Sequence, residues 1–237
     1  MANDFFNFKQ FTVRQKNAAF KVGTDGVLLG ACADLGNAAS ILDIGTGTGL
    51  IALMCAQRSD AEIIAIEPDH ASFLQAKENF ESSPWRERLS AVNSDLEKFA
   101  GDTRKKFDVI ISNPPYFRNS LINPEPGKAR LRHAFSLSSD DLLENSVLIL
   151  APEGSLQVIL PYEEGTIFMT EASGKGLFCN SMIKVKATPQ GKVIRLIMKF
   201  ETVKRKPHES FLAIETGTRH SYTREYMELT REYYLKF

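Results

Sequence analysis

Short apolar runs alternate with longer segments of helical spacing along most of the chain. Five runs have the length and the apolar content of buried strands, and they span residues 40–45, 61–67, 89–93, 107–112 and 154–160. Three intervening segments place apolar residues at helical spacing, namely 49–59, 70–83 and 139–150, the last with Ser138 or Ser139 as its cap. This alternation predicts parallel strands joined by right-handed helical crossovers, a doubly wound α/β fold.

The pattern changes after residue 160. A helix is expected at about 163–173, and the runs "CNSMIKVKA" and "KVIRLIMKFE", separated by "TPQG", predict a hairpin. These strands complete a Rossmann-like, seven-stranded, mostly parallel sheet with one antiparallel edge strand. Nearer the ends, residues 20–35 predict a glycine turn followed by a helix, and residues 222–237 predict a terminal amphipathic helix.

The chain has no internal repeat and no low-complexity linker, which favours one domain over residues 1–237. We expect an N-terminal extension (1–37) that serves as a substrate or cofactor lid, a catalytic core (38–200) and a C-terminal decoration (201–237). No segment has the apolar length of a membrane span or the pattern of a signal peptide. We therefore expect a cytoplasmic protein without a membrane partner. We also expect a monomer.

Cysteine and histidine usage gives no support for metal chemistry. The 3 cysteines and 4 histidines are scattered and form no zinc-binding or HExxH spacing. The formal net charge is zero, but the charges are unevenly distributed. Residues 1–24 hold 4 Lys or Arg against 1 acid, residues 103–134 hold 7 against 2, and residues 183–237 hold 12 against 6. A fold that gathers these segments can form a basic surface for nucleic acid, although ordinary solvated faces explain the same counts.

The stretch "ILDIGTGTGLIAL" places Asp43, Gly45, Gly47 and Gly49 where the first strand turns into a helix. Glycines permit the positive φ angles of a tight turn and let a ligand approach the backbone. The DxGxGxG spacing differs from the dinucleotide fingerprint GxGxxG and from a P-loop. An acid at the end of the second strand, Glu67, can accept hydrogen bonds from the hydroxyls of a ribose.

Two other acids, Asp95 and Asp69, are further candidates for binding the same ligand. Asp95 follows the third strand in "VNSDLEKF", where it can reach the amine of an adenine ring. Asp69 is a weaker rival of Glu67, because it lies past the strand end, after Pro68. A tight strand–helix turn without any ligand remains the alternative for the whole glycine-rich loop.

The motif "NPPY", residues 113–116, ends the predicted fourth strand. Each proline restricts the backbone around it, so the Asn113 amide and the Pro114 carbonyl are held as preorganised acceptors. Such acceptors suit methylation of an amine on a planar ring, because they stabilise positive charge as the nitrogen attacks. Tyr116 then offers a surface on which the target base stacks. The alternative is a strand-ending turn with Tyr116 in the core.

DxGxGxG with its acid resembles the class I methyltransferases that use S-adenosylmethionine, over residues 38–160. The resemblance implies that Asp43 and the glycine loop face the methionine part of the cofactor, Glu67 the ribose and Asp95 the adenine. NPPY resembles the motif of amino-methyltransferases for adenine N6, for some guanine or cytosine amines and for the amide of glutamine. It therefore specifies a planar NH₂ group without specifying which one.

Further stretches resemble the bacterial tRNA1(Val) (adenine(37)-N6)-methyltransferase family, namely "GTDGVLLGA", "NPPYF" with the "DLL" that follows, and "YTREY" with "YYL". This resemblance implies that Thr24 and Asp25 lie near the methionine end of the cofactor, with Asn113 also in contact with it. It also implies substrate-binding residues in the long basic loop that follows NPPY, namely Phe117, Arg118, Lys128, Arg130 and Arg132. Gly26 stands where the family frequently has alanine.

The function expected from the resemblance is S-adenosylmethionine-dependent methylation of the N6 amine of adenosine 37 in tRNA1(Val). Asn113, Pro114 and Tyr116 are the expected catalytic residues, and tRNA is the expected partner. One alternative is a glutamine N5-methyltransferase for release factors, but such enzymes carry a helical N-terminal domain, for which the residues before "ILDIGTG" leave no room. A non-catalytic S-adenosylmethionine-binding RNA adaptor is the other alternative, and the intact NPPY disfavours it.

Overall fold

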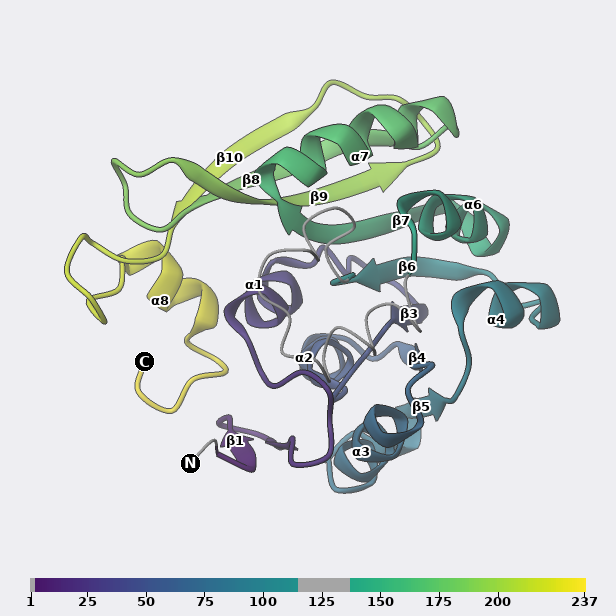
Figure 1. Cartoon of the computed structure of the whole chain (residues 1–237), viewed down its shortest axis with the longest axis horizontal. Helices are drawn as coiled ribbons and strands as arrows, with labels where there is room; N and C mark the ends of the chain where they lie inside the picture. The colour runs from purple at the N-terminus through teal and green to yellow at the C-terminus, as the bar shows by residue number, and fades with distance from the viewer. Residues whose placement is uncertain (1–2, 115–136) are drawn as a thin grey trace.

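A central sheet of eight strands forms the core of the protein (Figure 1). The structure is a computed structural model that describes residues 3–114 and 137–237. The strands are β3 (Ser40–Ile44), β4 (Glu62–Ile66), β5 (Leu89–Val92), β6 (Phe107–Ser112), β7 (Leu150–Pro161), β8 (Phe178–Lys186), β9 (Val193–Glu201) and β10 (His208–Ala213). Their order in the sheet is β10-β8-β9-β7-β6-β3-β4-β5. A separate hairpin, β1 (Phe5–Asn7) with β2 (Thr12–Arg14), lies near the N-terminus.

Helices cover both faces of the sheet, as a doubly wound fold requires. The described helices are α1 (Thr24–Cys32), α2 (Leu50–Arg58), α3 (His70–Glu81), α4 (Leu96–Asp102), α6 (Ser139–Ile149), α7 (Tyr162–Gly174) and α8 (Arg224–Thr230). One hydrophobic core joins the sheet to α1, α2, α3 and α8, and a second joins the opposite face to α4, α6 and α7. No helix in the described part of the chain is long and apolar enough to span a membrane.

The expected α/β class and the five core strands are confirmed, but the sheet has eight strands, not seven. The antiparallel strand β9 also lies inside the sheet, between β7 and β8, and not at its edge. Its burial fits this position, because Leu196 and Met198 pack into the core on one face of the sheet and Ile197 into the core on the other. The edge belongs to β10, which pairs in parallel with β8. Its short, mixed polar and apolar sequence did not predict a strand.

The C-terminal helix is shorter than expected, because α8 ends at Thr230. The Tyr233 amide bonds the Thr230 carbonyl, and the Tyr233 ring turns into the core, where its hydroxyl donates to the Met54 carbonyl at 3.3 Å. Burying this large ring favours a turn over a continued helix. By contrast, Ser138 is confirmed as the cap of α6, with a capping box to Asp141.

Candidate active site

The glycine-rich loop connects β3 to α2 at the carboxyl edge of the sheet, where open α/β folds bind their ligands. Gly45, Gly47 and Gly49 have φ angles of 69°, 57° and 83°. At Gly49 a Cβ atom would also lie 2.5 Å from the Phe80 ring, so both the positive φ angle and the lack of space exclude a side chain. The loop is tied to β4, because the Gly45 and Thr46 amides both donate to the Ile66 carbonyl at 2.9 and 3.1 Å. The positive φ angles predicted for the glycines of this turn are confirmed.

Asp43, the last residue but one of β3, is completely buried beneath this loop. Its Oδ2 accepts from the Thr46 hydroxyl at 2.6 Å and from the Ala52 amide at 3.2 Å. Its Oδ1 has no hydrogen-bond partner among the described residues. Burial raises the pKa of Asp43 to about 7, although both hydrogen bonds favour the charged form. An orphaned carboxylate oxygen under a glycine loop is suited to a positively charged ligand.

Glu67 directly follows β4, and its carboxylate joins the glycine loop to the start of α3. Oε2 accepts from the Gly47 amide at 2.8 Å, and Oε1 accepts from the Asp69 amide at 3.0 Å. Burial raises the pKa of Glu67, and the two amide hydrogen bonds lower it in part. Asn93, which follows β5, donates to the Glu67 carbonyl at 2.8 Å. This acid is therefore held firmly beside Gly47.

The other two predicted acids cap helices. Asp69 caps α3 by accepting from the Ser72 amide at 2.9 Å, so its carboxylate is engaged at the start of that helix. Asp95 caps α4 by accepting from the Lys98 amide through Oδ1 at 2.8 Å, and it is exposed. Both roles are typical of aspartate at a helix start. For Asp95, the capping bond leaves the second carboxylate oxygen facing solvent near the end of β5.

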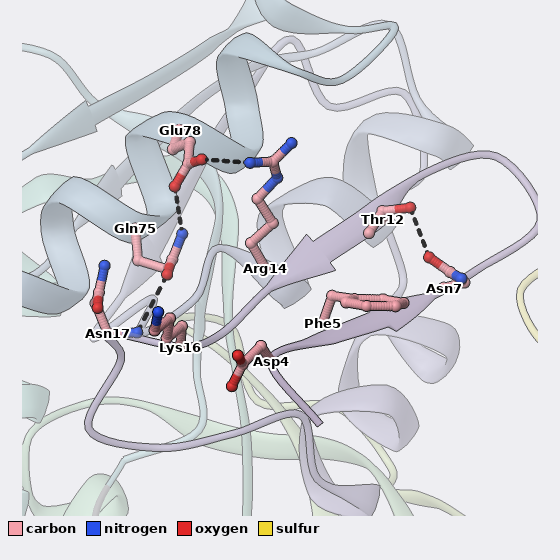
Figure 2. A pocket seen from close by; sticks show the side chains of 9 residues that line it. All are labelled: Asp4, Phe5, Asn7, Thr12, Arg14, Lys16, Asn17, Gln75 and Glu78. Carbon is pink, nitrogen blue, oxygen red and sulfur yellow. Dashed lines mark hydrogen bonds and ion pairs between the residues drawn. The ribbon is translucent and has the colours of Figure 1, made fainter. Parts of the chain in front are cut away.

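A row of buried polar side chains on α3 holds the segment that follows the N-terminal hairpin. We call this segment, residues 14–19, the strap. The Asn17 amide donates to Gln75 Oε1 at 3.3 Å, and the Ala19 amide donates to the Ser72 hydroxyl at 3.2 Å. Figure 2 shows Gln75 between Asn17 and Glu78, beside a pocket of about 490 Å³ between the hairpin and α3. The strap thus lies along α3, next to the glycine loop.

Asn79 joins the strap to the glycine-rich loop. Its Oδ1 accepts from the Arg14 amide at 2.9 Å, while Nδ2 donates to the Arg14 and Thr48 carbonyls, both at 2.8 Å. The residue is only 1% exposed, so these three backbone groups depend on it for pairing. One side-chain amide therefore fixes both the N-terminal segment and the second half of the loop.

The start of α1 brings Thr24 and Asp25 near the glycine loop. Gly26 packs against Leu50, the first residue of α2, so closely that a Cβ would lie 3.0 Å from the Leu50 side chain. Asp25 Oδ2 accepts from Arg195 Nε at 2.9 Å, which ties α1 to β9. Thr24 is exposed. The small residue at position 26, which departs from the family's frequent alanine, permits this close approach.

Asn113 and Pro114 follow β6, beside the glycine loop. β6 pairs with β3 so that Ser112 lies opposite Ile44, and the Ser112 hydroxyl donates to the Ile44 carbonyl at 2.9 Å. Asn113 is half-buried, and no described residue forms a hydrogen bond with its amide. The predicted residues Tyr116, Phe117, Arg118, Lys128, Arg130 and Arg132, with Pro115, lie outside the described residues.

Sequence reasoning missed the residues that support this site, namely Thr46, Asn79, Asn93 and Arg195. A signal existed for Asn79, because polar residues at positions 72, 75 and 79 follow helical spacing on a face that is otherwise apolar. Arg195 gave no signal, since its partner Asp25 is 170 residues away in the chain.

Comparisons with known proteins agree with this geometry. The family model of the methyltransferase small domain matches residues 10–164. A relative from Bacteroides thetaiotaomicron, named tRNA1(Val) (adenine(37)-N6)-methyltransferase, is 46% identical over 237 residues, which cover 99% of each chain. A relative of the same name from Trichodesmium erythraeum is 42% identical over 240 residues and covers 100% of both chains. The chain belongs to the tRNA1(Val) (adenine(37)-N6)-methyltransferase family.

Solved structures support the fold of this family member. The crystal structure of a predicted O-methyltransferase from Agrobacterium tumefaciens superposes with a TM-score of 0.69, over 88% of this chain and 96% of that chain. At 19% identity this likeness shows the class I methyltransferase fold alone.

The cofactor of this methyltransferase family is S-adenosylmethionine, and the site offers groups that fit it. The cofactor carries a sulfonium and an ammonium group, which suit the unpaired Oδ1 of Asp43. Its ribose hydroxyls suit the Glu67 carboxylate, which retains lone pairs beyond those used by Gly47 and Asp69. Gly45 and Gly47 have open space where a Cβ atom would stand, so a ligand can approach the backbone of the loop there.

Replacement of Asn79 by alanine is expected to weaken the binding of S-adenosylmethionine about tenfold, since a fixed Thr48 carbonyl helps to preorganise the loop. Gln75→Ala is the matched control, because Gln75 contacts the strap and Glu78 but not the loop. Both variants are expected to lose about 1–3 kcal/mol of folding free energy. Isothermal calorimetry with the cofactor separates them, and equal affinities for the two variants would contradict a role of Asn79 in the loop.

Proposed function

We propose that this protein transfers the methyl group of S-adenosylmethionine to the N6 amine of adenosine 37 in tRNA1(Val). The observation that carries the proposal is the identity of 46% over essentially the whole chain to a relative of that name. The position of Asn113 supports it, because its amide follows β6 beside the glycine loop and forms no hydrogen bond with the described residues. We also expect the protein to act as a monomer in the cytoplasm, where tRNA is found.

The chemistry proposed for Asn113 and Pro114 is acceptance of the two N–H bonds of the target amine. The nitrogen lone pair of adenine N6 is delocalised into the ring, so the neutral amine is a weak nucleophile. Acceptors fixed at the Asn113 amide and the Pro114 carbonyl stabilise the positive charge that develops as the nitrogen attacks. S-adenosylmethionine supplies, when bound, an electrophilic methyl group on sulfur. Most of the remaining acceleration comes from alignment of the reactants.

The proposal assigns the remaining predicted residues to substrate binding. Tyr116 stacks on the flipped adenine, a contact worth about 1–3 kcal/mol. The basic residues between 118 and 132 contact phosphates around the flipped nucleotide. Extrusion of the base costs least from a loop, and adenosine 37 lies in the anticodon loop.

The test is incubation of the protein with labelled S-adenosylmethionine and tRNA from cells that lack the modification. We expect label in tRNA, as N6-methyladenosine at position 37 of tRNA1(Val), mapped by nuclease digestion and mass spectrometry. A transcript of the same tRNA with guanosine at position 37 is the matched control and should remain unlabelled. Label found only in protein, as methylglutamine of a release factor, would overturn the proposal and indicate a glutamine N5-methyltransferase.

A further inference from the structure

Phe211 is an exposed aromatic residue on the edge strand β10. Its side chain is 64% exposed, although most large hydrophobic residues of the described chain are buried. The next residue, Leu212, points to the opposite face and packs in the core with α8 on that side. No helix of the described chain covers the face of β10 on which Phe211 lies, since α7 contacts β7, β8 and β9. The ring is therefore available to a partner.

Two lysines of the neighbouring strand β8 flank this ring. The parallel register places Phe211 opposite Lys184, with Lys186 two residues further along the same face. Their ammonium groups lie 5.7 and 5.4 Å from the centre of the ring. These distances are within the range of a cation–π interaction, which holds both lysines near the aromatic face.

Most of the positive charge here is not neutralised by the described residues. Lys184 forms an ion pair with Glu209, and Lys186 donates to the Pro189 carbonyl at 3.3 Å. Lys192, in the turn from β8 to β9, has no acidic partner among residues 3–114 and 137–237. We call Lys184, Lys186, Lys192 and Phe211 the edge patch. It combines an exposed ring with net positive charge.

The edge patch lies toward the carboxyl ends of the strands, as the active site does. Strands β8 and β10 run parallel to β6 and β7, so Lys186, which ends β8, and Asn113, which follows β6, are both at carboxyl ends. Figure 1 shows the turn after β8 and the chain leaving β10 on the side toward which β6 points. Four strand spacings separate β6 from β10, which corresponds to about 19 Å. A tRNA with one nucleotide at Asn113 is large enough to reach the patch.

We propose that the edge patch is a docking surface for the tRNA substrate outside the target nucleotide. Lys186 and Lys192 contact backbone phosphates, and Phe211 provides a flat apolar surface against which an unpaired base or a ribose packs. Lys184, already paired with Glu209, orients the ring. This inference rests on the proposed function. It adds a binding surface outside the basic loop that follows NPPY.

Lysines on an edge strand protect a sheet from pairing with other chains. The lysines of the edge patch lie on β8 and in the turn that follows it, one strand inside the edge strand β10, and the exposed Phe211 makes that edge more prone to association, so edge protection explains neither feature. A stacking surface for nucleic acid accounts for both, since cation and ring act on the same ligand.

The chain offers a matched control at the amino ends of the same strands. Lys204 lies 5.8 Å from the ring of Phe178, the residue that begins β8. Residues 204–206 precede the amino end of β10, away from the carboxyl ends of the strands.

The test compares three proteins with in vitro transcribed tRNA1(Val). They are the wild type, the patch variant Lys186→Gln/Lys192→Gln/Phe211→Leu and the control variant Lys204→Gln/Lys206→Gln. We expect the patch variant to raise the KM for tRNA at least about tenfold, with kcat at saturating tRNA within about twofold of wild type. The slope of log affinity against log salt should fall by about 2, because two phosphate contacts are lost. The control variant should keep the wild-type KM and slope.

A cofactor titration completes the design, since the patch does not touch the site of S-adenosylmethionine, whose affinity should be the same in all three proteins. If the patch and control variants show the same KM and salt slope, the docking surface is excluded. A fall in kcat with unchanged KM would likewise exclude it. If the wild type does not methylate tRNA at all, the proposed function fails first, and the two failures remain distinguishable.

Discussion

Asparagine at position 43 is expected to stabilise the folded protein above pH 7 while it weakens the binding of S-adenosylmethionine. Asp43 is fully buried, and its pKa rises from 3.8 to about 7 on folding. A carboxyl group with a raised pKa in the folded state costs nothing below its unfolded pKa. The cost grows as the pH rises and is complete above the folded pKa, at on the order of 4 kcal/mol.

Asparagine avoids this cost because it does not ionise. It keeps an oxygen for the Thr46 hydroxyl and the Ala52 amide, and a neutral group replaces the orphaned Oδ1. The free energy of unfolding of Asp43→Asn relative to wild type should therefore increase by about 2–3 kcal/mol between pH 5 and pH 8. Urea unfolding at the two pH values measures this change. A difference that does not vary with pH would show that Asp43 does not titrate in this range.

Asp34→Asn is the matched control for the pH dependence. The hydrogen bond from Lys199 lowers the pKa of Asp34, so its stabilising contribution is present above its unfolded pKa and is lost only in acid. The difference between this variant and the wild type should accordingly stay constant from pH 5 to pH 8. Calorimetry at pH 8 should show that only Asp43→Asn loses affinity for S-adenosylmethionine, by about tenfold or more, because a cationic ligand loses its buried counter-charge.

Replacement of Asn113 by alanine is expected to lower kcat by about thirty- to a hundredfold. The Asn113 amide and the Pro114 carbonyl together are expected to reduce the barrier by about 4 kcal/mol, which is about a thousandfold in rate. Alanine removes one of these two acceptors and leaves the backbone of the other. Affinity for the cofactor should change little, because the glycine loop and both of its acids are intact. Single-turnover methylation of tRNA and a cofactor titration measure the two quantities.

Ser112→Ala is the control for this experiment. Ser112 is the preceding residue, fully buried, and its hydroxyl bonds the Ile44 carbonyl, so its loss affects packing between β6 and β3. We expect it to lower the free energy of unfolding by about 1 kcal/mol while leaving kcat close to wild type. If Asn113→Ala lowers cofactor affinity as much as it lowers turnover, the residue has a structural role and the acceptor mechanism is wrong.

The core of the fold is predictable from the sequence because its strands are buried on both faces. Runs such as 40–44 and 107–112 are almost continuously apolar and are separated by helical segments, a pattern typical of a parallel sheet. Strand β10 escaped prediction because only Leu212 is buried in it. The end of α8 escaped prediction because helical spacing continues through Tyr233. The helix ends earlier because the Tyr233 ring is buried against α2, where its hydroxyl bonds the Met54 carbonyl.

In the site, contacts between residues close in the chain were predictable, and contacts between distant residues were not. Asp43, Gly47 and Glu67 were predictable because the strand–turn–helix unit that holds them is encoded within a few residues of each. Asp95 was expected at the cofactor, and its capping of α4 is a local contact that Asp-Leu-Glu-Lys also suggests. Asn79 was missed, because its partners Arg14 and Thr48 are 65 and 31 residues distant in the chain.

The contacts of Asn79 also bear on how the protein opens locally. Separation of the strap from α3 breaks both hydrogen bonds between Arg14 and Asn79, and these two bonds orient the amide whose Nδ2 also holds the Thr48 carbonyl. We therefore expect the N-terminal hairpin and the cofactor loop to open together in partial unfolding. Ligand binding to the loop is then linked to protection of backbone amides in the first twenty residues, although the ligand need not touch them.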